Sequence, residues 1–181
     1  MDMRVATMDD LDRVLQIIAD GKAALAAQGL DQWQAGSPTP AMLEADVRGG
    51  HARLAVDGDG AVLGTVSVFE EGEGDYDNVT SGAWLTESAN GAARGQVRYV
   101  VLHRMAVASE ARRRGVASFM LARCLEEARA RGFASVRVDT HEGNLPMQRT
   151  FEKAGMTRCC EIELSNQVEL TKKRIGFEIV L

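Results

Sequence analysis

The most constraining feature of this sequence is an apolar run over residues 97–108, near the middle of the 181-residue chain. Only Arg98, His103 and Arg104 interrupt its Val, Leu, Met, Ala and Tyr residues. A near-continuous run of this kind is typical of a central strand that other elements cover on both faces. A helical pattern follows at residues 115–131, with apolar residues on one face and Gly132 after it. The run and the helix together predict an α/β protein built around this strand.

The rest of the chain predicts further strands and helices within one domain, residues 1–181. Besides the central run, strands are expected at residues 3–6, 52–56, 61–69, 136–140, 157–164 and 172–180. Further helices are expected to start after Thr7, at Thr39 or Pro40, and after Asn144, with Gly29 and Gly155 as end signals. Residues 70–95 are expected to form a long loop. This order predicts a mixed central sheet flanked by about four helices.

Composition and charge narrow the class of function. The net charge is −5, and basic residues cluster at only one place, so nucleic acid is not expected as a partner. No stretch approaches the roughly 20 apolar residues that a membrane span needs. No apolar signal core follows the N-terminal Met1-Asp2-Met3-Arg4. We therefore expect a cytoplasmic protein without a membrane partner.

The three cysteines, Cys124, Cys159 and Cys160, indicate the same compartment. Their number is odd and their spacing is not that of a metal site, so reduced, buried thiols and no bound metal are expected. The adjacent pair could hold a nucleophile, but most cysteines behave as small core residues.

A cluster of three cations stands where the physical chemistry of a helix disfavours it. Arg112, Arg113 and Arg114 directly precede Gly115, which opens the helix after the central strand. The N-terminal end of a helix favours anions by about 0.3–1 kcal/mol per charge. A bound polyanion would explain the cations, because the free N–H groups of the first turn point at it. Gly115 allows close approach and Ala117 keeps the next contact small. The segment predicts a pyrophosphate cradle, the alternative being a solvated arginine cluster.

The motif at this turn resembles that of a known family. Neither G-x-x-x-x-G-K-[ST] nor G-x-G-x-x-G after a strand is present. The pattern Arg112-x-x-Gly115-x-Ala117 resembles the acyl-CoA-binding motif [RQ]-x-x-G-x-[GA] of the GNAT superfamily of N-acyltransferases. As in the family, a strand, then Asn144, then a helix ending in Phe151-Glu-Lys-Ala-Gly-Met follow.

The resemblance covers nearly the whole chain. The opening Arg4-Val-Ala-Thr-Met-Asp-Asp-Leu is similar to the first strand and helix of many members. The segments Asp31-Gln-Trp-Gln, His103-Arg-Met-Ala-Val and Asp139-Thr-His are most similar to those of a bacterial subgroup.

The resemblance implies a GNAT-like fold in which acetyl-CoA lies in a splay between two central parallel strands. It implies an N-acetyltransferase that moves an acetyl group directly onto the amine of a small molecule or protein. The residues expected to bind the cofactor are Met105, Ala106, Val107, Arg112, Arg113, Arg114, Gly115, Val116, Ala117, Ser118, Asn144, Met147 and Phe151. A non-catalytic acyl-CoA-binding domain and an unrelated nucleotide-binding α/β protein are the alternatives.

Amine acylation needs a polarised thioester carbonyl, a neutral amine and, in many cases, a proton for the leaving thiolate. Many GNAT enzymes donate this proton from a tyrosine at the position of Phe151, which has none, so water or another residue would serve. His103 is the first candidate for the general base, since histidine's ordinary pKa of about 6.5 suits that task. His141 is the second. Alternatively, His103 is a hydrogen-bonded structural residue of its strand, and His141 is a loop residue without a catalytic role.

The acceptor contacts are expected on the first helix connector and on the loop before the central strand. The candidates are Trp33, Glu70, Tyr76 and Trp84. The three aromatic residues could equally be half-buried packing residues, and Glu70 could be solvated like its neighbour Glu71. His51 looks incidental. The last strand, residues 172–180, could serve a homodimer interface, and the identity of the acceptor is not encoded in any of these motifs.

Overall fold

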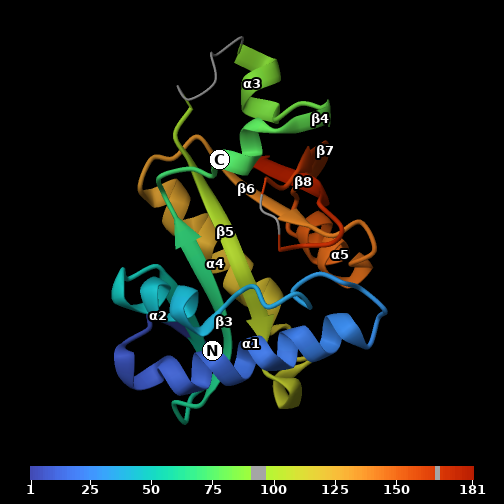
Figure 1. The fold of residues 1–181 in the computed structure, drawn as a ribbon. Coiled ribbons are helices and arrows are strands. Elements are labelled where there is room, and N and C mark those ends of the chain that lie inside the picture. Colours follow the sequence, from blue (N-terminus) through green and yellow to red (C-terminus); the bar gives the residue numbers. More distant parts are fainter. Residues whose placement is uncertain (91–96, 166–167) are drawn as a thin grey trace.

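The computed structural model describes residues 1–90, 97–165 and 168–181, with only the backbone for residues 88–90. One mixed sheet runs through the molecule in the order β1-β2-β3-β5-β6-β8-β7-β4 (Figure 1). Its strands are β1 (Asp2–Val5), β2 (Ala52–Val56), β3 (Val62–Phe69), β4 (Val79–Gly82), β5 (Tyr99–Val107), β6 (Ser135–Thr140), β7 (Thr157–Glu163) and β8 (Lys173–Val180).

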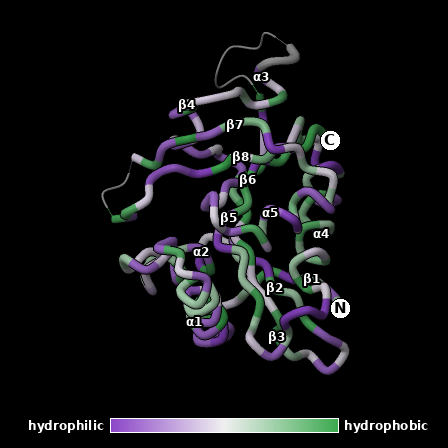
Figure 2. Tube along the Cα trace, turned by 90° about the vertical axis from the view of Figure 1, so that its right-hand side faces the viewer, coloured by the Kyte–Doolittle hydropathy of each residue, from purple (hydrophilic) through white to green (hydrophobic). Residues whose placement is uncertain are grey.

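Helices cover the sheet on both faces. They are α1 (Leu11–Ala26), α2 (Pro40–Arg48), α3 (Leu85–Asn90), α4 (Val116–Ala130) and α5 (Leu145–Lys153). Three short 3₁₀ turns accompany them, η1 (Met8–Asp10), η2 (Gly74–Asp77) and η3 (Ser109–Ala111). Figure 2 places α1 and α2 on one side of the strands and α4 and α5 on the other. Within the described ranges, none of the helices is long and apolar enough to cross a membrane.

The central strands are buried because α1 and α4 pack on them from opposite sides (Figure 2). Ile17 of α1 and Met120 of α4 are fully buried, as are Leu54 of β2 and Val66 of β3. The doubly covered strand that the apolar run predicted is therefore confirmed. The expected strands and long helices also appear, with bounds that differ by at most two residues, except that α1 starts at Leu11 because the 3₁₀ turn η1 occupies Met8–Asp10.

One expectation from the sequence is wrong. The described part of the expected loop, residues 70–90, contains η2, β4 and α3, and α3 brings the α-helices of the described residues to five. β4 is a short strand that pairs with β7, with Val79 opposite Ile162, a partner too distant in sequence for a local pattern to show. Residues 91–95 of that loop lie outside the described residues.

The last strand, which could have paired with a second copy, is an inner strand of the sheet. β8 lies between β6 and β7 and pairs antiparallel with both. Because both of its backbone edges are used, it cannot add a strand from a second copy, and a homodimer could not form through its backbone.

The sheet divides in its middle. β5 and β6 are parallel and pair over only three residues each, ending with Val101 opposite Arg137. β5 then continues to Val107 along β3, while β6 continues to Thr140 along β8. The β3–β5 ladder shifts register opposite this stretch, and Arg104 there adopts a φ of 54°. The outcome is an opening between the carboxyl ends of the two central strands.

A buried ion pair lies where the division begins. Arg137 and Glu178 have side chains 1% and 0% exposed, and the Arg137 Nε lies 3.0 Å from a carboxylate oxygen of Glu178. The carboxylate also accepts hydrogen bonds from the hydroxyls of Thr86 (2.7 Å) and Ser135 (2.6 Å). The guanidinium lies 4.6 Å from the ring centroid of Trp84. This cluster joins β6 and β8 to the start of α3.

We predict that Glu178→Leu lowers the free energy of unfolding by about 3–5 kcal/mol, because it removes the buried counter-charge of the Arg137 guanidinium and leaves only the partly exposed Glu87 as its ionic partner. The double variant Arg137→Met/Glu178→Leu should recover a large part of this loss, since no charge then stays buried. Urea unfolding of both variants, with Glu87→Gln as the control for a partly exposed partner of Arg137, measures the effect. A double variant less stable than Glu178→Leu would contradict the prediction.

Candidate functional site

A cavity of about 430 Å³ occupies the opening between β5 and β6. Four parts of the chain form its walls: the ends of the two strands, the first turn of α4 with α5, α1 with its connector to α2, and the described residues around η2 and before β8. Of the residues that the sequence singled out, those that line it are Trp33, Tyr76, His103, Met105, Ala106, Val107, Arg112, Ala117, Asn144, Met147 and Phe151. The opening thus collects most of the expected site residues in one place.

One end of the cavity is the N-terminus of α4. Gly115 stands before the helix with a φ of 77°, a conformation that glycine adopts at no steric cost, and no side chain caps the first turn. The first intrahelical bond runs from the Phe119 N–H to the Gly115 carbonyl, so earlier N–H groups have no partner within the helix. By contrast, Thr39 caps α2 and Asn144 caps α5.

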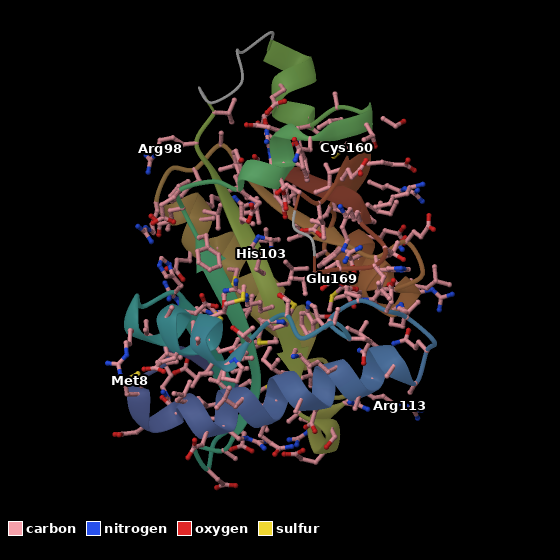
Figure 3. The ribbon with its side chains drawn as sticks, viewed as in Figure 1. Met8, Arg98, His103, Arg113, Cys160 and Glu169 are labelled. Carbon is pink, nitrogen blue, oxygen red and sulfur yellow. The ribbon has the colours of Figure 1, made fainter. Side chains whose placement is uncertain are left out.

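The three arginines surround this uncapped end. Arg112, Arg113 and Arg114 are all exposed, and none of them forms an ion pair with a described residue. Arg112 lines the cavity and donates a 2.8 Å hydrogen bond to the Asp20 carbonyl of α1. Figure 3 shows Arg113 at the edge of the molecule, beyond α1. Unpaired cations and free N–H groups together form a place that suits a polyanion.

The remaining expected cofactor residues differ in what they offer. The Val116 side chain is buried in the core and only its backbone faces the turn, while Ser118 is exposed on the first turn of α4. The Asn144 amide is engaged within the protein, because it accepts from the Met147 N–H and donates to the Thr140 hydroxyl. It therefore shapes the cavity wall rather than presenting free polar groups. Phe151 is 4% exposed and packs on Phe177.

The other end of the cavity carries a polar network around His103. The His103 Nε2 lies 2.9 Å from a carboxylate oxygen of Glu73, and its Nδ1 lies 3.9 Å from Asp139. The bond to Glu73 assigns the imidazole proton to Nε2 and leaves Nδ1 as a free base. The bond from His103 holds the pKa of Glu73 below its ordinary value, against the opposing effect of burial. The arrangement is therefore a histidine whose proton-bearing nitrogen is held by a carboxylate.

Tyr76 places a hydroxyl group at the same end. Its side chain is 1% exposed, and its hydroxyl donates a 3.0 Å hydrogen bond to Asp139. Burial raises the pKa of Tyr76 well above its ordinary value, and the negative charge of Asp139 raises it further. The phenol therefore keeps its proton and gives it to the Asp139 carboxylate as a hydrogen bond.

The side opposite β5 is built from the connector after α1 and the loop before β8. Trp33 has a φ of 66°, and its N–H donates to Glu169 at 3.3 Å. Gly21 of α1 makes room for its ring, since a Cβ there would lie 3.0 Å from it. Figure 3 shows His103 and Glu169 near the centre of the molecule, where both line the cavity.

Two expected acceptor contacts do not reach the cavity. Trp84 is fully buried in a separate cluster, where its Nε1–H donates to the Tyr76 carbonyl at 2.8 Å. Glu70 pairs with Arg131, with 2.7 Å between the Arg131 Nη2 and the carboxylate, and does not line the cavity. Trp84 is a packing residue, and Glu70 joins the end of β3 to the end of α4.

His141, the second candidate base, is held by contacts within the protein. Its Nδ1 accepts a 2.9 Å hydrogen bond from the Gly143 N–H, and its Nε2 lies 3.3 Å from Asp31. It is 9% exposed and is not part of the cavity lining. Both of its ring nitrogens are therefore engaged, and it connects the loop after β6 to the connector after α1. The second candidate base is thus not at the site.

Among the described residues, the sequence analysis missed six charged ones that the fold brings to the cavity: Glu73, Asp75, Arg104, Asp139, Glu169 and Arg174. Glu73 and Asp139 contact His103, while Glu169 in the loop before β8 pairs with Arg174 of β8. Asp139 could have been found, because it ends a central strand beside the opening, where ligands of open α/β sheets bind. The other five gave no signal, since only tertiary folding places them there.

Comparison with known proteins agrees with this geometry. Residues 22–156 match the acetyltransferase (GNAT) family, and the chain belongs to this family. The family resemblance found in the sequence, the fold class and the assignment as an acetyltransferase are thereby confirmed. No curated protein matches the sequence.

Several solved structures share the fold. A GNAT family acetyltransferase from Streptococcus agalactiae 2603 is 26% identical with a TM-score of 0.83, and the match covers 99% of this chain and 95% of that one. A putative acetyltransferase from Staphylococcus aureus Mu50 is 19% identical with a TM-score of 0.69, with 99% of both chains covered. A ribosomal-protein-alanine N-acetyltransferase from Brucella melitensis is 20% identical with a TM-score of 0.64, with 100% of both chains covered.

We predict that Tyr76 stays un-ionised in the folded protein well above pH 10, the ordinary pKa of tyrosine. Above that pH the unfolded chain loses the proton that the folded chain keeps, so stability falls as pH rises. Alkaline ultraviolet titration of Tyr99→Phe, in which Tyr76 is the remaining tyrosine, measures this. The same variant in urea is the control, and ionisation at the same pH in both would contradict the prediction.

Proposed function

We propose that this acetyltransferase moves an acetyl group from acetyl-CoA directly to the amine of a small molecule or protein. The observation that supports the proposal most strongly is that one cavity joins an uncapped, arginine-flanked helix N-terminus to a carboxylate-held histidine. The free thiols of Cys124, Cys159 and Cys160 fit a reducing compartment such as the cytoplasm.

The residues present fit acetyl-CoA. The first-turn N–H groups of α4 and the side chains of Arg112, Arg113 and Arg114 hold the pyrophosphate. The stretch Met105 to Val107 has its edge toward β6 unpaired, so its backbone groups are free for the pantetheine arm. Met147 and Phe151 close the apolar side of that channel. When bound, acetyl-CoA supplies the thioester carbonyl that the amine attacks, with a C–N bond formed and the C–S bond broken.

His103 is the general base in this proposal. Its Nδ1 accepts the proton that the acceptor amine loses, while Glu73 on Nε2 and Asp139 near Nδ1 stabilise the imidazolium that results. Phe151 has no proton to give and the Tyr76 hydroxyl is committed to Asp139, so the leaving thiolate takes its proton from water. The base and its carboxylate argue against the alternative in which the domain binds acyl-CoA without turnover.

The cofactor site makes a direct prediction. Arg112→Ala/Arg114→Ala should raise the Kd for acetyl-CoA at least about tenfold, which corresponds to about 1.4 kcal/mol for the lost charge contacts. Titration calorimetry with acetyl-CoA, ATP and NAD measures this. Arg123→Ala/Arg129→Ala, which removes two cations from the exposed side of the same helix, is the matched control. If the wild type binds ATP or NAD in preference to acetyl-CoA, the proposal is wrong.

The base makes a second prediction. His103→Gln should lower kcat by about 10²–10⁴-fold and remove the acidic limb from the pH profile of kcat/KM. Glu73 does not account for that limb, because the bond from His103 holds the pKa of Glu73 below its ordinary value. His51→Gln is the matched control, since His51 bonds to the Val68 carbonyl outside the cavity. An unchanged acidic limb in His103→Gln would assign the base to another group.

A further inference from the structure

We infer that the acceptor is an amine that carries a second cationic group, such as a diamine. The inference rests on the proposed acetyl transfer, and it names the chemistry that the acceptor side of the same cavity recognises. That side is formed by the connector after α1, the turn η2 and the loop before β8, opposite the uncapped end of α4.

The first observation is the charge of the acceptor side. Four carboxylates line it: Glu73, Asp75, Asp139 and Glu169. Glu169 is 6% exposed and Asp139 has a side chain 10% exposed, so part of this charge is screened from water. Negative charge in a partly dry cavity raises the local concentration of cations and strengthens their binding.

The second observation is that the nearby cations are already engaged. Arg174 is 2% exposed, lies 3.3 Å from Glu169 and 3.9 Å from Asp139, and donates to the carbonyls of Thr171 and Lys173. Arg104 forms an ion pair with Asp46, which lies outside the cavity lining. One guanidinium can offset only one of the carboxylates that line the acceptor side. That side therefore keeps a surplus of negative charge while His103 is neutral.

The third observation is the balance of hydrogen-bonding groups. Gln32 lines the same side and is 9% exposed, and its carbonyl oxygen has no hydrogen-bond partner among the described residues. Two donors of this region are used internally, since the Tyr76 hydroxyl bonds to Asp139 and the Trp33 backbone N–H bonds to Glu169. The wall thus presents mainly acceptors, so a matching ligand must bring N–H donors.

Charge and donor balance both exclude an anionic acceptor. An amine with a carboxylate of its own would meet like charges and find few donors, which costs affinity on both counts. An amine with only one nitrogen is neutral when it reacts, so it does not neutralise the surplus negative charge of the carboxylates. A second ammonium or guanidinium group neutralises part of the surplus negative charge and donates N–H groups to the hydrogen-bond acceptors of the wall.

Asp75 is the carboxylate best suited to hold that second group. Glu73 and Asp139 serve His103, and Glu169 pairs with Arg174. Asp75 is half-buried, and its Oδ1 accepts from the Ser165 N–H at 2.9 Å. The change Asp75→Asn keeps an oxygen for that bond and removes the charge. Asp77 is an exposed acid on the same turn that does not line the cavity, so Asp77→Asn is its matched control.

The test compares three amines of matched length: 1,4-diaminobutane, n-butylamine and 4-aminobutanoate. Steady-state acetylation should give the highest kcat/KM for the diamine, at least about tenfold above butylamine, and the lowest for 4-aminobutanoate. Asp75→Asn should lower the diamine-to-butylamine ratio several-fold through KM, with kcat little changed. Comparing this ratio between variants cancels the different basicities of the amines. The diamine KM should also rise with ionic strength, unlike that of butylamine.

The outcomes separate this inference from the function on which it rests. If butylamine matches the diamine, or if Asp75→Asn and Asp77→Asn leave the same ratio, the acceptor class is wrong and acetyl transfer stands. The inference is likewise overturned if acetyl-CoA binds but the diamine is not acetylated in the steady-state assay and, by calorimetry, binds no more tightly than butylamine. If acetyl-CoA itself does not bind, the proposed function fails first.

Discussion

The buried pair of Arg137 and Glu178 is the interaction on which the organisation of the site depends. It lies beneath the point where β5 and β6 separate, and its guanidinium packs against Trp84. Trp84 in turn bonds to the backbone of Tyr76, whose hydroxyl bonds to Asp139 at the cavity. A continuous set of contacts therefore runs from the buried pair to the wall beside the proposed base. A buried charge pair is costly to desolvate, and the hydroxyl partners of Glu178 explain how this one is accommodated.

The division of the sheet is the second constraint, and it has a cost of its own. Beyond Val101, the edge of β5 that faces β6 has no strand to pair with, although backbone groups without partners are expensive in a protein interior. A fold that leaves these groups open gains a channel lined by free backbone donors and acceptors. The register shift and positive φ at Arg104 turn the strand at this place. The cofactor arm, in the proposed function, completes the interrupted ladder.

How much of this could be predicted follows from the range of the contacts involved. The turn from Arg112 to Gly115 was predictable, because a helix start and its charges lie within a few residues of each other. Trp84 was misassigned, since an aromatic residue in a Gly-rich segment looks exposed until β4 pairs with β7 and buries it. Glu73 and Glu169 come from segments far apart in sequence, and only the closed sheet brings them to one cavity. Local patterns thus predicted the cofactor end and missed most of the acceptor end.

The two ends of the cavity have opposite electrostatic character, and this separation has a consequence for binding order and orientation. Around Arg112, cations and a helix N-terminus face outward, whereas carboxylates such as Asp75 line the acceptor side. An anionic cofactor and a cationic acceptor would each be repelled by the other's end, so each has only one favourable way to enter. The opposite charges of the two ligands also match the opposite potentials of the two ends, which orients the ligands before any close contact forms. Because the chain as a whole is acidic, with a net charge of −5, the arginine cluster is an exception, and in the proposed function the anionic cofactor accounts for it.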